Sequence, residues 1–394
     1  MDYNNAPMIP MSSPDLTDAE RQAVLAVINT PALSMGPYIA AFEEAFCQHT
    51  GLRHAIGVSS GTAGLHLCAL ASGVKDGDLV ITTPFSFAAS SNVLLYERAI
   101  PVFVDVDTRT GNIDPDMVEQ AAAQLSAGGS AARRWLPRRA ADKPAALKAI
   151  LAVDVFGQMA DYDRLRETAR RYNLKLLQDS CESLGATYKQ RPAGTLGDMA
   201  VFAFYPNKQI TTGEGGMIVT DDDQAAGMMR ALRNQGRAPG DTWLEHSFLG
   251  YNYRLDEMSA ALGSAQMQRL ESLLAARQQV AGWYNKLLAE IQGVEAPQLA
   301  PETTRASWFV YVIRLARGID RAAVTARLAQ KSIPVRPYFS PIHLHKYMVE
   351  RFGYRPGDYP VTEDLGARGL ALPFSGKMTQ TQVETVCRAL REAL

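Results

Sequence analysis

The sequence predicts an α/β protein with a mostly parallel central sheet, helices on both faces of that sheet, and a smaller α+β portion at the C-terminal end. From about residue 50 to 235, short β-prone runs alternate with helical patterns, which implies crossover connections between strands. Two of these runs, Ala149–Val153 and Val201–Phe204, are continuously apolar, which is typical of strands buried on both faces. After Arg254 the pattern becomes mainly helical.

The individual elements follow from the period of the apolar residues, which is two in strands and close to four in helices. The expected strands are Ala55–Ser59, Leu79–Thr83, Pro101–Asp105, Ala149–Val155, Leu174–Gln178, Met199–Phe204, Met217–Thr220 and Val310–Leu315. The expected helices are Gly61–Ser72, Ala88–Glu97, Asp161–Tyr172, Gln224–Asn234, a long amphipathic segment from about Asp256 to Ile291, Arg321–Lys331 and Gln380–Glu392.

We place a domain boundary near residue 270, within the long helix. Residues 1–270 then form a large α/β domain with an N-terminal arm, and residues 271–394 form a small α+β domain. The stretch Ala127–Lys148 is rich in Ala, Gly and Arg and breaks the alternation, so we expect a surface insertion. Its basic run, Arg133–Arg139, is expected to be solvated.

The composition excludes several classes of function. The chain has 394 residues, of which 47% are hydrophobic and 21% charged, with a formal net charge of −1. This balance predicts no nucleic-acid partner and no membrane association. The four cysteines are scattered, with no CxxC pair, so we expect neither a zinc site nor a disulfide framework. The N-terminal residues do not resemble a secretory signal, and a reducing cytoplasm is the expected location.

Ligands bind at the carboxyl ends of strands in open α/β sheets, so the residues at these ends form the candidate site. Ser59–Gly64 joins a strand to a helix through small residues, which suits a phosphate at the helix N-terminus. A plain helix cap by Ser60 or Thr62 explains the same pattern. Asp179 follows the expected strand Leu174–Gln178. Its carboxylate could cap a turn, or it could hold a charged heteroaromatic nitrogen in a desolvated site.

Lys208 lies 29 residues beyond Asp179, just past the next apolar strand. It could be a solvated turn lysine, a counter-ion for Glu214, or an amine that bonds covalently to a carbonyl. Two adjacent parallel strands would bring Asp179 and Lys208 to one edge of the sheet, beside the phosphate site. Pyridoxal phosphate requires this set: the lysine forms a Schiff base, the aspartate keeps the pyridine nitrogen protonated, and the helix end anchors the phosphate. Phe87 could lie against the cofactor ring, although its spacing alone favours a buried core position.

A co-linear series of motifs spans most of the chain. In order these are LSMGPYIAAFEEAF, SSGTAGLHLCAL, DLVITTPFSFAAS, PVFVDVD, QDSCESLGA, FYPNKQITTGEGGM, LGYNYRLDEMSAALGSAQ, YFSPIHLHKY and LALPFSGKMTQ. Together they resemble the DegT/DnrJ/EryC1/StrS family of pyridoxal-phosphate-dependent sugar aminotransferases, which have fold type I. The resemblance extends from about Leu33 to Leu390.

The resemblance implies roles for particular residues. Lys208 matches the lysine that holds pyridoxal 5'-phosphate, and Asp179 matches the partner of the pyridine nitrogen. Glu182 falls near the ring 3′-oxygen, Gly61 and Thr62 fall in the phosphate-binding turn, and Phe87 falls at the stacking position. Asn252 matches an asparagine that reaches the phosphate of the neighbouring subunit, which implies a homodimer with shared active sites. The chain departs from the family at Ala203, where many members have a phosphate-binding serine, so we expect that contact to be lost or replaced, for example by Asn207 or a water.

The resemblance also implies the reaction. An amino acid, glutamate in the first instance, would give its amino group to a nucleotide-linked 3- or 4-keto-deoxysugar by a ping-pong mechanism through the Schiff base of Lys208. Relatives with histidine in place of this lysine act as dehydratases, so the lysine favours transamination. A sugar dehydratase or inosose-type aminotransferase of the same family, and a non-catalytic cofactor-binding regulator, are the alternatives.

Two further segments offer candidate contacts. His343 and His345 alternate along the chain, but no third ligand is spaced to complete a metal site, and we predict none. The resemblance places this segment near the substrate entrance, so His343 and Tyr338 are expected substrate contacts. Arg254 could bind a substrate phosphate, although an ion pair with Asp256 or Glu257 is the simpler expectation.

Overall fold

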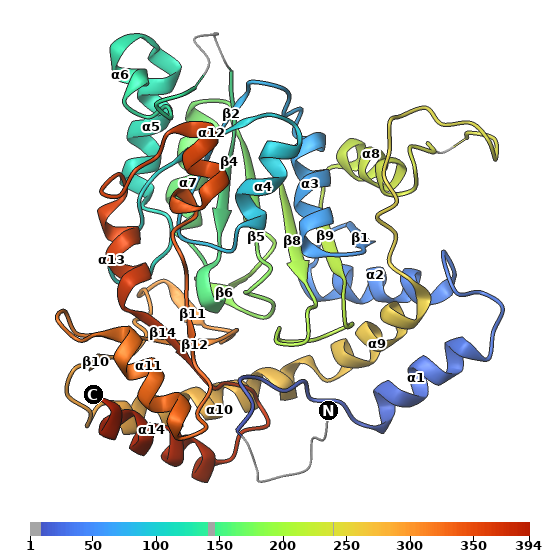
Figure 1. The fold of residues 1–394 in the computed structure, drawn as a ribbon. Helices are drawn as coiled ribbons and strands as arrows, with labels where there is room; N and C mark the ends of the chain where they lie inside the picture. The colour runs from blue at the N-terminus through green and yellow to red at the C-terminus, as the bar shows by residue number, and fades with distance from the viewer. Residues whose placement is uncertain (1–8, 141–145, 239) are drawn as a thin grey trace.

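A seven-stranded sheet forms the centre of the fold (Figure 1). The structure is a computed structural model that describes residues 9–140, 146–238 and 240–394. The strands lie in the order β1 (His54–Val58), β9 (Gly216–Thr220), β8 (Met199–Ala203), β5 (Lys175–Asp179), β4 (Leu147–Val153), β2 (Leu79–Thr82) and β3 (Ile100–Phe103). The four pairs from β8 to β3 are parallel, whereas β9 is antiparallel to both β8 and β1. The prediction of a mostly parallel sheet is confirmed.

The antiparallel pairing of β8 and β9 decides where Lys208 lies. Antiparallel neighbours can be joined by a short loop, whereas parallel neighbours need a crossover segment. The chain therefore leaves β8 at Ala203, passes through Lys208 and enters β9 at Gly216 without leaving the end of the sheet. Asp179 is the last residue of β5, and its register partner on β8 is Val201. The predicted convergence of Asp179 and Lys208 at one sheet edge follows from this pairing.

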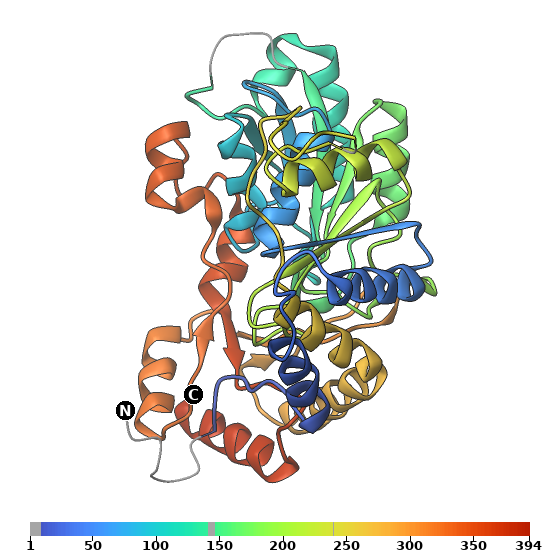
Figure 2. The same ribbon diagram turned by 90° about the vertical axis from the view of Figure 1, so that its right-hand side faces the viewer.

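Helices cover both faces of the sheet (Figures 1 and 2). One face carries α3 (Gly61–Ala71), α4 (Ala89–Tyr96) and α8 (Asp223–Arg233), and the other carries α2 (Pro37–Thr50), α5 (Pro115–Ala127) and α7 (Tyr162–Arg171). Strand β4 shows why its sequence is continuously apolar. Ile150 and Ala152 belong to the core on one side, and Leu151 and Val153 belong to the core on the other.

A second, four-stranded antiparallel sheet forms the C-terminal unit, which lies below the large sheet in Figure 1. Its strands are β10 (Val294–Glu295), β12 (Tyr311–Leu315), β14 (Gly369–Leu372) and β13 (Arg336–Pro337), and its core includes side chains of α10 (Leu270–Leu288), α11 (Arg321–Gln330) and α14 (Gln380–Ala393). The N-terminal segment also joins this unit, because Ile9 is part of its core and the Met11 carbonyl accepts a hydrogen bond from the Phe374 N–H.

The long helix predicted over residues 256–291 is two helices. α9 (Glu257–Gln268) and α10 meet at Arg269, which has φ −108° and ψ 7°. The Arg269 guanidinium pairs there with Glu20 at 2.8 Å and with Asp15 at 3.1 Å, so the bend is fastened to the N-terminal segment. We propose that the boundary between the two domains, expected near residue 270, falls at this bend.

The remaining elements are short or peripheral. They are α1 (Asp18–Ile28), α6 (Gly129–Arg133), α12 (Lys346–Phe352), α13 (Pro360–Arg368), the 3-10 turns η1 (Val155–Gly157) and η2 (Ile342–Leu344), and a three-stranded sheet of β11 (Thr303–Arg305), β6 (Thr187–Tyr188) and β7 (Arg191–Pro192). Within the described residues, none of the helices combines the length and apolar character that crossing a membrane requires.

The predicted insertion at 127–148 is more closely packed than expected. Trp135 is buried, and its indole N–H donates to Gln124 at 2.9 Å. Arg138 binds Asp358 through two hydrogen bonds of 2.5 and 2.7 Å. The expectation of a solvated run is therefore wrong for Trp135, whose ring fills a core site, whereas the Arg138 side chain remains about half exposed beside its carboxylate partner. Residues 141–145 of this stretch lie outside the described residues.

Candidate active site

Asp179 ends strand β5 as a buried carboxylate. Its side chain is 5% exposed. One oxygen accepts a hydrogen bond from the Ser90 hydroxyl of α4 at 2.7 Å, and the other accepts from the Cys181 N–H at 3.2 Å. No lysine or arginine in the described part of the chain forms an ion pair with it. A buried carboxylate is stable as a charge only beside a partner, so this one is suited to a cationic ligand.

Lys208 lies in the loop between β8 and β9 with its amine enclosed. The side chain is only 13% exposed, and Nζ lies 3.7 Å from Glu182 Oε1. The same atom lies 3.7 Å from the centre of the Phe309 ring, which is a cation–π contact. Lys208 is therefore not a solvated turn lysine. It is also not the counter-ion of Glu214, because Glu214 is exposed and the carboxylate beside the amine is that of Glu182.

Glu182 is buried opposite the lysine. Its second oxygen accepts a hydrogen bond from the Phe156 N–H at 2.9 Å, which fixes the carboxylate between Lys208 and η1. Burial raises the pKa of Glu182, and the charge of Lys208 opposes that rise. The pair therefore provides a proton donor and a proton acceptor side by side in a site from which water is largely excluded.

Helix α3 points its N-terminus at the same place. Ser60 caps the helix by accepting from the Ala63 N–H at 3.0 Å, as the simpler reading predicted. The cap uses only one of the N–H groups that have no partner within the helix, so a phosphate could use the others. A Cβ atom on Gly61 would lie 2.7 Å from the Ala203 Cβ and 2.8 Å from the Cys181 sulfur. Glycine is therefore required at position 61 to bring the helix end this close to β8 and the Asp179 turn.

Phe87 precedes α4 and is 69% exposed. The expectation that spacing alone favoured, a buried core aromatic, is wrong, and the ring is available to lie against a ligand. Ser90, which binds Asp179, is a residue that the sequence reasoning missed. It lies in the first turn of α4, and its spacing from Asp179 in the sequence gives no signal that the two side chains meet.

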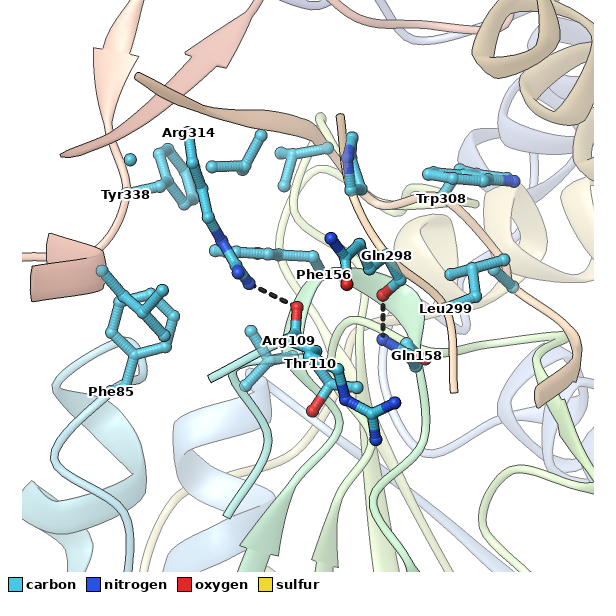
Figure 3. Close-up of a pocket in the computed structure, with 17 residues that line it drawn as sticks. Phe85, Arg109, Thr110, Phe156, Gln158, Gln298, Leu299, Trp308, Arg314 and Tyr338 are labelled. Carbon is cyan, nitrogen blue, oxygen red and sulfur yellow. Dashed lines mark hydrogen bonds between the residues drawn. The ribbon is translucent and has the colours of Figure 1, made fainter. Parts of the chain in front are cut away.

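Tyr338 lies beside the site at the junction of the two sheets. Its ring contacts Phe156 and Phe309, with centres 6.0 and 6.4 Å apart. Burial, with a smaller contribution from the negative charge of Glu182, raises the pKa of Tyr338 to about 12. Tyr338 also borders a cavity of about 40 Å³. Figure 3 shows Tyr338 among the side chains that line it, with Phe156, Arg314 and Trp308. This cavity can hold a few waters but neither a cofactor nor a sugar.

The expected substrate contact at His343 is contradicted. Its side chain is fully buried, Nε2 lies 3.0 Å from Glu363 Oε1, and the ring packs edge-on against Tyr359. The side chain packs against Tyr354 and Tyr359, whose rings contact Phe103 of β3, and it is inaccessible to a substrate. The described residues contain no cluster of His, Cys, Asp and Glu side chains that could hold a metal ion.

Arg254 and Asn252 lie on the segment that follows α8. Arg254 donates to the Asn234 side-chain oxygen at 3.0 Å, and the described residues show no ion pair between it and Asp256 or Glu257. The reason is that Glu257 is buried and accepts the N–H groups at the start of α2, whereas Asp256 caps α9. Asn252 is exposed, as a residue that reaches a neighbouring subunit would be.

Comparison with known proteins places the chain in a family. The profile of the DegT/DnrJ/EryC1/StrS aminotransferase family matches residues 14–391. GDP-perosamine synthase of Caulobacter vibrioides is 38% identical over 395 residues, which cover 99% of this chain and 100% of the relative. The putative pyridoxal phosphate-dependent aminotransferase EpsN of Bacillus subtilis is 32% identical over 383 residues, covering 96% and 94%. The solved structure of Helicobacter pylori PseC, an aminotransferase of pseudoaminic acid biosynthesis, has a TM-score of 0.86 at 26% identity and covers 98% of this chain and 99% of that one.

The fold and the site define a pyridoxal-phosphate-dependent enzyme of fold type I. Within that class the chain belongs to the DegT/DnrJ/EryC1/StrS aminotransferase family, and it is an aminotransferase. The predictions of family, fold, cofactor and enzyme class are confirmed.

The residues present fit the cofactor. Lys208 offers an enclosed amine, Asp179 offers a carboxylate with which no cation among the described residues forms an ion pair, and Gly61 allows close approach to a helix N-terminus. Next to the lysine, the side-chain oxygen of Asn207 is buried without a hydrogen-bond partner. An orphaned amide of this kind is expected where a polar ligand completes the site. Ala203, where the resemblance implies that many members carry a phosphate-binding serine, lies against Gly61.

Proposed function

We propose that this sugar aminotransferase moves an amino group from an amino acid, glutamate in the first instance, to a nucleotide-linked 3- or 4-keto-deoxysugar. The observation that carries the proposal is the enclosed amine of Lys208, 3.7 Å from Glu182 and at the same sheet edge as the buried carboxylate of Asp179. The full-length similarity to a GDP-perosamine synthase supports a GDP-linked sugar as the first acceptor to examine.

Each residue has a part in the proposed reaction. Pyridoxal phosphate, when bound, supplies a protonated ring that accepts electrons from the bond broken at the substrate Cα. Asp179, held by Ser90, would keep the ring nitrogen protonated, because a buried anion stabilises an adjacent cation. Lys208 would hold the cofactor, and its amine, once released, would carry the proton at Cα. Glu182, whose Oε1 lies 3.7 Å from Nζ, would accept or return that proton.

A donor and an acceptor would use this site in turn, as the ping-pong scheme requires. Glutamate reacts first and leaves as 2-oxoglutarate, and the sugar ketone then receives the amino group at the same position. The lysine argues against the dehydratase alternative, and the intact set of Lys208, Asp179 and Thr62 argues against a regulator without catalysis.

The reaction is tested with the purified holoenzyme. It is expected to be yellow, to shift its absorbance to shorter wavelength with glutamate, and to aminate at least one keto sugar in a screen of GDP-, dTDP- and UDP-linked acceptors. Lys208→Arg is expected to lose both half-reactions, whereas Lys175→Arg, at an exposed surface lysine, is expected to keep them. Turnover by Lys208→Arg at an undiminished rate would refute the assignment.

We further propose a homodimer in which Asn252 reaches the site of the partner. The exposed apolar side chains of Trp243, Leu244 and Leu249, which are 75%, 82% and 89% exposed, lie on the segment that leads to Asn252 and would be covered by a second copy. Co-expression of Lys208→Ala with Asn252→Ala tests this arrangement. Shared sites predict recovery of roughly a quarter of wild-type activity, because half of randomly paired dimers carry one intact site. If the mixture is no more active than the two variants separately, the sites are not shared.

A further inference from the structure

Arg277 is a buried arginine without a carboxylate partner. It lies on α10, is 5% exposed, and forms no ion pair within the described residues. Its guanidinium donates to four backbone carbonyls, those of Trp308 at 3.1 Å, Phe309 at 3.2 Å, Asn207 at 3.2 Å and Lys208 at 2.5 Å. Burial lowers the pKa of Arg277 to about 10. A buried charge that faces four carbonyl dipoles and the Phe374 ring, whose centre lies 5.8 Å from Cζ, but no carboxylate among the described residues, is costly, so its presence points to a positional requirement.

The four acceptors come from the two segments that enclose the amine of Lys208. Asn207 and Lys208 belong to the loop that carries the amine, and Trp308 and Phe309 belong to the segment whose ring lies 3.7 Å from Nζ. Each segment presents two successive carbonyls, one pair to Nη2 and the other to Nη1. The planar guanidinium has donors in a rigid fork that can join two such pairs, which a single ammonium group cannot do.

We propose that Arg277 is a positioning residue that sets where Lys208 Nζ stands between Glu182 and Phe309. The inference rests on the proposed role of Lys208 as the cofactor-holding amine. Arg277 acts through the backbone and touches neither substrate nor cofactor. Helix α10 begins at the bend after Gln268 and belongs to the C-terminal unit. The hydrogen bonds of Arg277 therefore also connect the loop that carries Lys208 to that unit.

The magnitude follows from the geometry. Without the guanidinium hydrogen bonds of Arg277, the loop that carries Lys208 and the segment that carries Phe309 can move independently. A displacement of ~1 Å at a reacting group can lower a rate by about 100-fold. Arg277→Lys keeps a positive charge but cannot join both carbonyl pairs, and Arg277→Met keeps the length of the side chain without any donor. Both are expected to capture pyridoxal phosphate on Lys208 at least ten times more slowly than wild type.

The experiment uses the full-length apoprotein and pyridoxal phosphate, so it needs no sugar substrate. The capture rate is followed by visible absorbance, and borohydride reduction with peptide mass spectrometry locates the cofactor on Lys208. The visible circular dichroism per captured cofactor reports whether the cofactor is held in one orientation, and we expect at least half of it to be lost in both variants. Val280→Ala is the matched control, because it removes buried apolar contacts one turn along α10 in the core of the C-terminal unit.

The outcomes separate a positioning role from a structural one. Val280→Ala is expected to lower the melting temperature while the capture rate and the dichroism per cofactor stay within twofold of wild type. If Arg277→Lys melts lower but keeps both signals within twofold, Arg277 serves stability alone and the inference is refuted. If Arg277→Met does not fold, Arg277→Lys decides the question. If wild type itself is not trapped at Lys208, the proposed function fails rather than the role of Arg277.

Discussion

Asp154 is a buried carboxyl next to the candidate site, and its raised pKa predicts a measurable dependence of stability on pH. It follows strand β4, is fully buried, and accepts hydrogen bonds from the hydroxyls of Tyr162 at 2.7 Å, Ser180 at 2.8 Å and Ser183 at 2.7 Å. Burial is the largest influence and raises the pKa of Asp154 from 3.8 to about 6, although these bonds favour the charged form. The two serines lie on the turn that also carries Asp179 and Glu182, so this carboxylate supports that turn.

The sign and size of the pH effect follow from linkage. The folded protein holds the Asp154 proton at pH values where the unfolded chain has released it, so the free energy of unfolding falls as pH rises from about 4 to about 6. At ~1.4 kcal/mol per pKa unit, the total is about 3 kcal/mol, of which about 2 kcal/mol falls between pH 4.5 and 7. With an unfolding entropy of ~2.1 cal/mol/K per residue, 2 kcal/mol corresponds to about 2 °C in the melting temperature of this chain.

The test compares the wild-type apoprotein with Asp154→Asn by thermal unfolding in steps from pH 4.5 to 7. The melting temperature of wild type, relative to the variant, is expected to fall by about 2 °C across this range. Asp163→Asn is the control, because hydrogen bonds from Arg191 and Lys189 lower the pKa of Asp163 to about 2, so its contribution does not vary at these pH values. If the wild-type and Asp154→Asn curves run parallel, the carboxylate is not titrating as the structure requires.

Three further substitutions test the site. Gly61→Ala places a methyl group 2.7 Å from the Ala203 side chain, so we expect at least a tenfold loss of cofactor affinity by equilibrium titration, whereas Gly227→Ala, which meets nothing within 4 Å, should leave affinity unchanged. Equal affinities would show that the helix end is not the phosphate site. Ala203→Ser restores the hydroxyl of the family pattern and is expected to tighten cofactor binding about tenfold, since a hydrogen bond to a charged group contributes ~1.5 kcal/mol or more; no gain would mean that another group already makes the contact. His343→Gln removes a buried partner of Glu363 and should cost ~1–3 kcal/mol of stability in a denaturant titration, with KM for the sugar unchanged. A selective rise in KM would return His343 to the substrate site.

The class of fold could be predicted because it depends on local pattern. The apolar run of β4 could be read as a strand buried on both faces, and the pairing of β5 with β8 then placed Asp179 and Lys208 at one edge. The motif series in the chain led to the family and the cofactor for a similar reason, since the residues that bind a cofactor lie at fixed offsets from strand ends. The glycine at 61 was likewise visible in the sequence, although the atoms that require it were not.

The partners of these residues depended on packing between segments far apart in the chain. Ser90 meets Asp179 across 89 residues, and Arg277 meets Lys208 across 69. A strand or helix pattern reports which face of an element is apolar, but it does not report which loop crosses that face. Burial shows the same limit, because the pattern around Phe87 and His343 is local, whereas the exposure of the first ring and the enclosure of the second are set by whether another element covers them. Residue types and strand order thus determine the chemistry this chain can perform, and the close packing of distant segments determines the geometry in which Lys208 is held.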